Sequence, residues 1–546
     1  MTRRLDSAIR RAEAWLVRLD PAPRPTPLST QFLLCFLFLV ALTMWLVGSN
    51  KYLPGQDISY HAHCSRVWLE GGRAGSPYAL YEPGHPLEAN TLMYTVAGVM
   101  SYFGSSFTAF RLVQCVYLVG LPIACLYALR ALGRSPWGSL LAFPLCYTEM
   151  FAAGYANMAF AAPSFILALV EYRRFTQAPS VRRGVVTSAL FVVVFLSHAH
   201  VYLWLGGLLL LYSLAVFVRR LLDSASMGPR DALRSVLVFV GGGVAVAAPS
   251  LALFARWYAR GYGSGNSVGA GGNDVSFASS LVWLPLYQKF MGGVLQAFSA
   301  TTNVNEVPHL LALAALVTLA MALARVAHDR SPPLPELAVL ITAASYYVLP
   351  DTVALQMVAV RQWYFVFWML PLVVVPVSLK VGPVRSLVVI GALLAWTGAR
   401  MAVITSHLRR FTTEEMVGFD RVVAAAPKTP GLLLAYSTVS PRSRYWLTSS
   451  MFHSYGFLSA QRSYDGPLEY SDARSVAAVR YTNGPPKPIK HLYGNAQWPL
   501  DPGIWEYDLV LVHRWAPTPA QKQVAESRGA LLAASGDWQL WRSLKP

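Results

Sequence analysis

Charged residues are scarce in this chain, and acidic residues are the scarcest. Only 13% of its 546 residues are charged, with 27 Asp and Glu against 45 Lys and Arg. The mean hydropathy is +0.41. A water-soluble protein of this length needs a far more charged surface. The composition therefore predicts that most of the chain faces lipid.

Several sequence signatures of common functional sites are also missing. There is no CxxC pair and no HExxH motif, and the glycine-rich stretch Gly261–Asp274 lacks the lysine and hydroxyl ending of a phosphate-binding loop. These absences argue against a structural zinc, a dithiol site and a nucleotide site. The five cysteines form no disulfide framework; they are Cys35, Cys64, Cys115, Cys125 and Cys146.

Long apolar runs dominate what is present. The first, Gln31–Gly48, carries no charge and is long enough to cross a bilayer core of ~30 Å as a retained anchor. Thr91–Phe103 is shorter and predicts a re-entrant or interfacial helix. Further spans, giving about eleven with the first, are expected near 109–130, 137–153, 157–171, 184–197, 201–219, 234–255, 308–326, 335–350, 362–379 and 384–405.

The basic residues indicate topology and not nucleic-acid binding. They cluster in short loops that fall on one side of the membrane in this count, as expected of cytoplasmic loops. The topology predicts a cytoplasmic N-terminus, a transmembrane module over 28–405 with its first outside loop at 50–108, and an extracytoplasmic C-terminal domain at 406–546. The basic segment 1–27 is either an amphipathic helix on the membrane surface or a disordered tail.

The chain changes character after about residue 406. Phe411–Ala426 has a helical pattern, whereas Gly431–Ser437, Tyr507–Trp515 and Trp538–Trp541 are typical of strands. The expected fold class is therefore mainly α, a polytopic helical bundle with a small α/β domain outside the membrane.

Candidate catalytic residues lie just past the first span. Asp57 is placed to act as a general base towards an acceptor hydroxyl, or else it caps the helix that starts at Ile58. His61 shares a helix face with Asp57. Arg361 precedes an apolar run, where it either binds a lipid phosphate with Trp363 beside it or is an ordinary interfacial arginine.

Other polar residues reach the same predicted surface. The Ser197–His200 turn presents His198 and His200, and the first loop presents Glu82 and His85, with Arg256 nearby. The histidines bind a divalent metal, line an active-site cavity or form structural hydrogen bonds. Glu82 and His85 equally fit a solvated loop.

The layout and two stretches resemble the GT-C glycosyltransferases. Asp57 matches the position of that family's first-loop catalytic aspartate, and Gly154–Leu169 and Phe195–Leu205 resemble stretches of bacterial members. Arg361 would match a residue that contacts the lipid phosphate. The family's paired first-loop acids are absent, because Gln56 and Ile58 flank Asp57, and there is no WWDYG motif.

The resemblance implies a glycosyltransferase of the bacterial plasma membrane. It would move a sugar from a polyprenyl-phosphate donor to an extracytoplasmic glycan, lipid or protein, with Asp57 and His61 as catalytic residues. No cofactor is expected, although a divalent metal stays open, and the expected partners are the donor and membrane lipids, without nucleic acid. The alternatives are a flippase for a lipid-linked glycan, an acyl or phosphoethanolamine transferase, or a non-catalytic scaffold.

Overall fold

The protein is described by a computed structural model. The structure describes residues 28–76, 78–79, 81–224, 229–261, 282–301, 306–323, 334–353, 356–357, 359–374, 383–429, 431–437, 443–446, 455–462, 464–465, 479–481 and 498–544. The proposed N-terminal amphipathic helix and nearly all of the glycine-rich stretch lie outside these residues.

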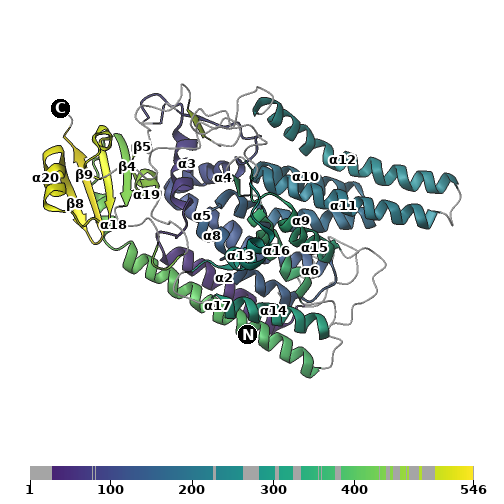
Figure 1. The fold of residues 1–546 in the computed structure, drawn as a ribbon. Coiled ribbons are helices and arrows are strands. Elements are labelled where there is room, and N and C mark those ends of the chain that lie inside the picture. The colour runs from purple at the N-terminus through teal and green to yellow at the C-terminus, as the bar shows by residue number, and fades with distance from the viewer. Residues whose placement is uncertain are drawn as a thin grey trace.

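The first three-quarters of the chain form a helical bundle (Figure 1). Its long helices coincide with the predicted spans, because uncharged apolar runs satisfy their backbone hydrogen bonds internally only as helices. They are α2 (Thr30–Ser49), α5 (Ser106–Leu118), α6 (Gly120–Ala131), α9 (Ala156–Gln177), α10 (Val181–Ser197), α11 (Ala199–Ser224), α12 (Pro229–Gly261), α14 (Val307–Leu323), α15 (Leu334–Val348), α16 (Ala359–Val374) and α17 (Pro383–Arg410).

Within the described residues, 5 stretches are long and apolar enough to cross a membrane on their own. They are Thr30–Ser49, Ser106–Ala131, Ala199–Val218, Phe239–Ala259 and Leu387–Glu415. Thr91–Phe103 is helical but short, as expected, and consists of α4 (Leu92–Met100) and the 3₁₀ turn η1 (Ser101–Phe103).

The prediction of one span over 137–153 is wrong. This run folds into the 3₁₀ helix η2 (Pro136–Leu141) and two short helices, α7 (Ala142–Leu145) and α8 (Glu149–Ala153). A Cβ atom at Gly138 would lie 2.5 Å from the carbonyl oxygen of Pro371. This run therefore packs directly against the backbone of α16 instead of crossing the bilayer as one helix.

The C-terminal region contains the expected small sheet. Its five strands have the order β5-β4-β7-β9-β8, with β4 parallel to β5 and β7, and with β9 antiparallel to β7 and β8. The strands are β4 (Gly431–Ser437), β5 (Tyr464–Asp465), β7 (Leu509–His513), β8 (Gly529–Ser535) and β9 (Trp538–Ser543), and the accompanying helices are α18 (Phe419–Ala425), α19 (Tyr455–Gln461) and α20 (Pro519–Arg528).

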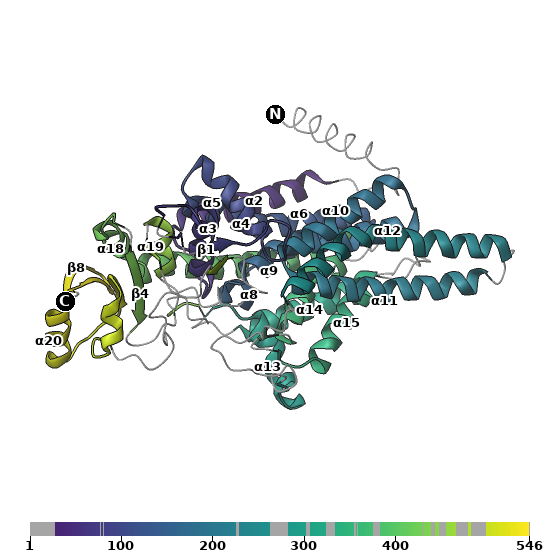
Figure 2. The same cartoon turned by 90° about the horizontal axis from the view of Figure 1, so that it is seen from above.

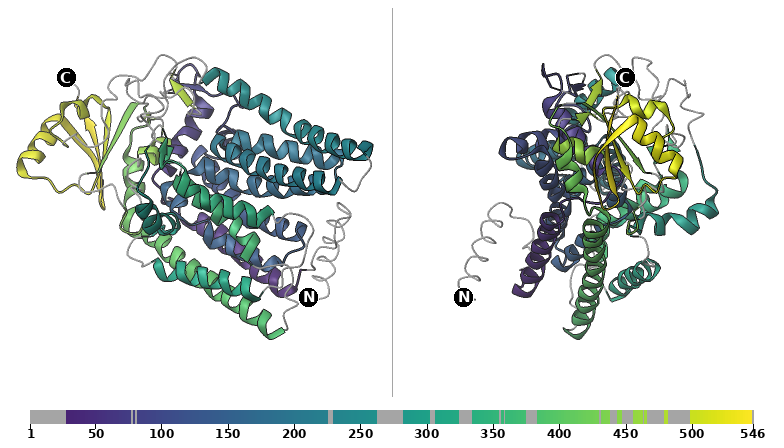
Figure 3. Two further views of the ribbon diagram at one scale, coloured as in Figure 1. Left: turned by 45° about the vertical axis from the view of Figure 1, so that its right-hand side comes forward. Right: turned by 90° about the vertical axis from the view of Figure 1, so that its left-hand side faces the viewer.

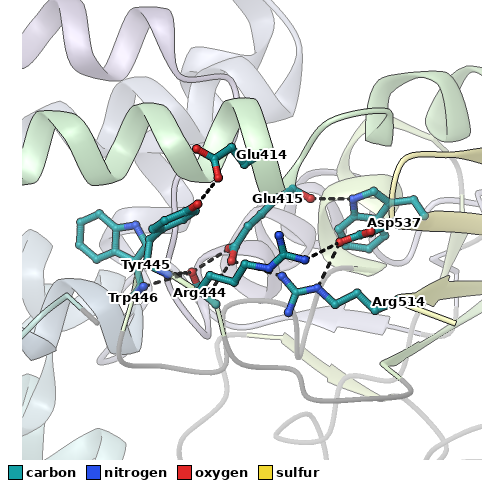
Figure 4. Close-up of polar contacts among 9 residues, drawn as sticks. Glu414, Glu415, Arg444, Tyr445, Trp446, Arg514 and Asp537 are labelled. Atoms are coloured by element: carbon teal, nitrogen blue, oxygen red, sulfur yellow. Dashed lines mark hydrogen bonds and ion pairs between the residues drawn. The ribbon is translucent and has the colours of Figure 1, made fainter. Parts of the chain in front are cut away.

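A buried carboxylate joins the sheet to helix α17. Glu415 ends the π-helical turn η4 (Phe411–Glu415) and is fully buried. Its carboxylate accepts hydrogen bonds from Ser443 Oγ at 2.7 Å and from the backbone of Arg444, and it lies 3.4 Å from Arg514 Nη2 (Figure 4). The indole of Trp538 on β9 donates to the Glu415 carbonyl at 3.0 Å. These contacts fix the sheet to one end of the bundle.

The sheet lies at one end of the molecule, and the C-terminal end of α11 and the start of α12 lie at the other (Figures 1 and 2). We call the first of these the sheet end. Helix α3 (Ile58–Glu70) lies there, and strand β1 (Tyr81–Pro83) of the same loop pairs with β6 (Val479–Tyr481). Helices α2 and α17 both run towards this end (Figure 3).

Candidate active site

Backbone pairing fixes the segment that carries Asp57 to the end of helix α8. The Gln56 N–H donates to the Ala152 carbonyl at 2.9 Å, and the Asp57 N–H donates to the Ala153 carbonyl at 3.1 Å. Gly154 follows with φ +80°, and a Cβ atom there would lie only 2.6 Å from the Asp57 nitrogen. Only glycine fits both this backbone conformation and this close approach.

Asp57 occupies the N-cap position of α3, but its side chain makes no capping hydrogen bond. Capping alone therefore does not explain the residue. Burial raises the pKa of Asp57 from 3.8 to about 7, and the nearby Arg361 guanidinium opposes part of this rise. A carboxyl group with this pKa exchanges a proton close to neutral pH, as a general base requires.

Arg361 lies at the centre of a group of polar side chains that are far apart in the sequence. Its guanidinium carbon stands 5.0 Å from the centre of the Tyr155 ring, in a cation–π contact. Its charge acts on Asp57, on Glu149 and on Tyr155. It also acts on His198 and His200. We call these six residues the Arg361 cluster.

Four longer helices begin at the Arg361 cluster. Asp57 precedes α3, Tyr155 precedes α9, His200 is the second residue of α11, and Arg361 is the third residue of α16. Each helix N-terminus carries unsatisfied N–H groups and the positive end of the helix dipole. Together with the guanidinium, these ends make the cluster a suitable environment for an anion such as a phosphate.

Glu149 is a member of the cluster that the sequence analysis missed. Burial raises the pKa of Glu149, on the short helix α8, to about 7, again with Arg361 opposing the rise. Among the described residues, its Oε2 atom is buried without a hydrogen-bond partner. An acid at the end of an apolar run was the available signal, but the run was interpreted as a span.

His61 lies beside the cluster, on the first turn of α3. Its Nδ1 atom is 2.5 Å from the Tyr94 hydroxyl, and Asn157 Nδ2 donates to the same hydroxyl at 3.4 Å. Burial lowers the pKa of His61 to about 3, so the ring is neutral at physiological pH. His63, two residues on, contacts the Tyr78 ring instead, so the two imidazoles diverge.

His198 and His200 flank the break between α10 and α11, as the split at this point predicts. Their ring centres are 6.3 Å apart. The His200 ring also stacks on Phe365 of α16 at 5.9 Å and 14°. Its Nε2 atom is buried without a hydrogen-bond partner in the described part of the chain. The stacking contact therefore orients the ring, and Nε2 can still form a hydrogen bond.

The other predicted binding residues lie outside the cluster. Trp363 packs on Tyr346 at 5.7 Å. Glu82 lies exposed on β1, opposite Arg480 in the strand pairing, and the exposed His85 accepts a hydrogen bond from the Leu87 N–H at 3.1 Å. Arg256 lies exposed on α12. Binding roles for these four residues stay predictions.

The described residues contain no group of three or more His, Cys, Asp or Glu side chains placed to hold a metal ion. Two further polar residues of the sheet end, Lys289 and Asp351, pair with each other at 3.1 Å. Lys289 also donates to the carbonyls of Tyr346 and Leu349, which indicates a structural role. Independence from cofactors and metals stays a prediction.

Comparison with known proteins identifies solved structures with a similar fold. No protein-family model matches the chain, and no curated protein matches its sequence. Among solved structures it is similar to ArnT from Cupriavidus metallidurans, both bound to undecaprenyl phosphate and in the apo state. The chain has the fold of ArnT. Each alignment covers 94% of this chain and 98% of that chain, with a TM-score of 0.51 and 12% sequence identity.

An identity this low establishes the fold and leaves the chemistry to the residues themselves. The alignment covers nearly the whole length of both chains. It confirms the expected architecture, a helical membrane bundle with a small sheet domain. The fold also explains why Asp57 and Arg361, about three hundred residues apart, lie close together.

Proposed function

We propose that this protein is a membrane glycosyltransferase that moves a sugar from a polyprenyl-phosphate donor to an acceptor hydroxyl. The observation that carries the proposal is the Arg361 cluster, in which a guanidinium and four helix N-termini meet a carboxylate with a pKa of about 7. The ArnT of similar fold has been crystallised with undecaprenyl phosphate.

Arg361 would hold the donor phosphate. A guanidinium binds two phosphate oxygens at once in a fixed fork, which lysine cannot do. The cation–π contact with Tyr155 orients this fork. Asp57 and Glu149 both have a pKa of about 7, so both are only partly ionised near neutral pH and repel a bound phosphate less than full carboxylates would.

Asp57 would act as the general base. Its carboxylate accepts the proton of the acceptor hydroxyl while the hydroxyl oxygen attacks the anomeric carbon of the donor sugar. The bond between that carbon and the phosphate oxygen breaks, and the electron pair stays on the phosphate. Arg361 and the helix N-termini stabilise the negative charge that develops there.

Glu149 and the histidines would position the sugar and the acceptor. The unpartnered Glu149 Oε2 is available to accept a hydrogen bond from a sugar hydroxyl. The Nε2 atom of His200 offers one further polar contact. His61, neutral and held by Tyr94, fits a positioning role better than a proton-transfer role.

The proposal includes an orientation. The Arg361 cluster and the sheet would face the extracytoplasmic side of a bacterial plasma membrane. Arginine pairs lie at the opposite ends of three helices, and they are Arg173 and Arg174 of α9, Arg182 and Arg183 of α10, and Arg219 and Arg220 of α11. Labelling of single cysteines in intact cells checks this. A cysteine introduced at the exposed Glu82 should react with a membrane-impermeant reagent, and protection of that position would contradict the orientation.

Binding of undecaprenyl phosphate to the purified protein tests the phosphate site. Arg361→Ala should weaken binding about tenfold or more, and Arg361→Lys should recover only part of the loss. Asp57→Asn should bind at least as tightly as the parent, because it removes a negative charge near the phosphate. Equal affinities of the alanine variant and the parent would refute the role of Arg361.

A further inference from the structure

A cavity of about 670 Å³ lies between helices α2 and α17, away from the Arg361 cluster. Its lower walls are apolar and include Phe38 and Leu39 of α2 and Met401 of α17. Its upper rim, towards the sheet end, carries Arg409 and Arg410, which are both exposed. We call this cavity the α2–α17 groove.

The groove opens towards lipid. Only 33% of the α2 span and 39% of the α17 span are buried inside the protein. Both helices run towards the sheet end (Figure 3), where Thr412 Oγ1 donates to the Asn50 side chain at 2.8 Å and closes the top. The space therefore lies beside the exposed faces of two candidate membrane spans.

The dimensions match one leaflet. From Gly398 to Arg410 the helix rises 12 residues at 1.5 Å each, about 18 Å. Half of a bilayer core of about 30 Å is about 15 Å. The arginines therefore lie at headgroup level when the apolar walls lie beside the acyl chains. A volume of about 670 Å³ suits one small ligand and not the face of a partner helix.

The charges at the rim favour an anionic headgroup. Arg410 has Glu414 at 4.0 Å, so part of its charge is already balanced. Arg409, one residue earlier, adds a second guanidinium at the same level. Basic side chains at a membrane surface attract anionic lipids, and guanidinium groups bind phosphate oxygens through charge-assisted hydrogen bonds.

We propose that the α2–α17 groove binds one anionic phospholipid, with its phosphate at Arg409 and Arg410 and an acyl chain between the two helices. This second lipid site is independent of the donor site. It lies against the segment that connects α17 to the sheet through Glu415, so an occupied groove would also brace that connection.

Native mass spectrometry of the full-length protein, titrated with phosphatidylglycerol or with phosphatidylcholine of the same acyl chains, tests the proposal. The parent should prefer phosphatidylglycerol. The double variant Arg409→Gln with Arg410→Gln should lose that preference, with phosphatidylglycerol binding reduced about tenfold or more. A preference that persists in the double variant would refute the headgroup assignment.

Glycine variants test the acyl-chain path. A Cβ atom at Gly398 or at Gly391 of α17 meets nothing within 4 Å, so leucine fits at both positions, but only Gly398 lines the groove. Gly398→Leu should reduce binding of both lipids at least fivefold, and the matched Gly391→Leu should behave like the parent. Parent-like binding by Gly398→Leu would place the lipid elsewhere.

The donor site supplies a control that separates the two proposals. Arg361→Ala should leave phosphatidylglycerol binding unchanged, and the groove variants should leave undecaprenyl phosphate binding unchanged. If Arg361→Ala lowers the binding of both lipids equally, the protein has one lipid site and the second-site proposal fails. Loss of undecaprenyl phosphate binding alone leaves the groove proposal intact.

Discussion

The substitution Asp57→Asn separates a catalytic role of the Asp57 carboxylate from a structural one. A catalytic role predicts that the variant is more stable than the parent, and a structural role predicts that it is less stable. The carboxyl group is half-buried, and its pKa rises from 3.8 to about 7 on folding. Between these pH values the unfolded chain releases the proton while the folded chain retains it, so the folded state loses stability as the pH rises. The loss is complete above about pH 7, where it amounts to about 4 kcal/mol as an upper limit.

Asparagine carries no such cost, and it retains the shape of aspartate. The variant should therefore unfold at a higher temperature than the parent at pH 8. The difference should shrink as the pH falls and vanish below about pH 3, where the parent's carboxyl group is protonated in both states. Transfer should fall about 100-fold or more, because the proton acceptor is lost.

The assay is sugar transfer from a panel of polyprenyl-phosphate sugars in detergent, with a melting curve for each preparation. Parent activity should fall about tenfold for each pH unit below about 7, as Asp57 becomes protonated. Glu70→Gln is the matched control, since Glu70 lies on the same helix and only pairs with Arg66 at 3.1 Å. Transfer by the asparagine variant at more than half the parent rate would refute the base assignment.

Three further substitutions test the surroundings of the site. Glu149→Gln should raise KM more than it lowers kcat, since the amide keeps one acceptor oxygen. Steady-state kinetics measure both constants. A loss in kcat alone, as large as that of Asp57→Asn, would make Glu149 the base instead. Gly154→Ala forces a Cβ atom to within 2.6 Å of the Asp57 nitrogen at positive φ. It should lower the free energy of unfolding by about 2 kcal/mol or more and abolish transfer. A parent-like melting curve would contradict the close approach. Glu415→Ala removes the acceptor of the Ser443 hydroxyl and of the Arg444 N–H, and one of the two acidic partners of Arg514. Limited proteolysis should then release the sheet domain faster, and an unchanged cleavage rate would show that other contacts hold it.

Hydrophobic runs predicted most of the helices, because a span is a local property of the sequence. The strands Gly431–Ser437, Leu509–His513 and Trp538–Ser543 were also predictable from short apolar β-branched and aromatic segments, whereas β8 was missed because its alanines weaken the pattern. The break at 137–153 was not predictable, since it depends on contact with the backbone of α16.

The candidate site was predictable in part. Asp57, Arg361, His198 and His200 stood out because polar residues at the ends of apolar runs need an explanation. Tyr155 and Glu149 did not, because their roles arise only from tertiary contact with Arg361. The start of four helices at or next to members of the Arg361 cluster is equally invisible in a linear sequence.

A structure of this protein with undecaprenyl phosphate would test the central proposal most directly. We expect the phosphate to lie within hydrogen-bonding distance of the Arg361 guanidinium, beside Asp57 and Glu149 and at the start of α16. A phosphate bound at Arg409 and Arg410 alone, with no lipid at Arg361, would contradict the proposed donor site.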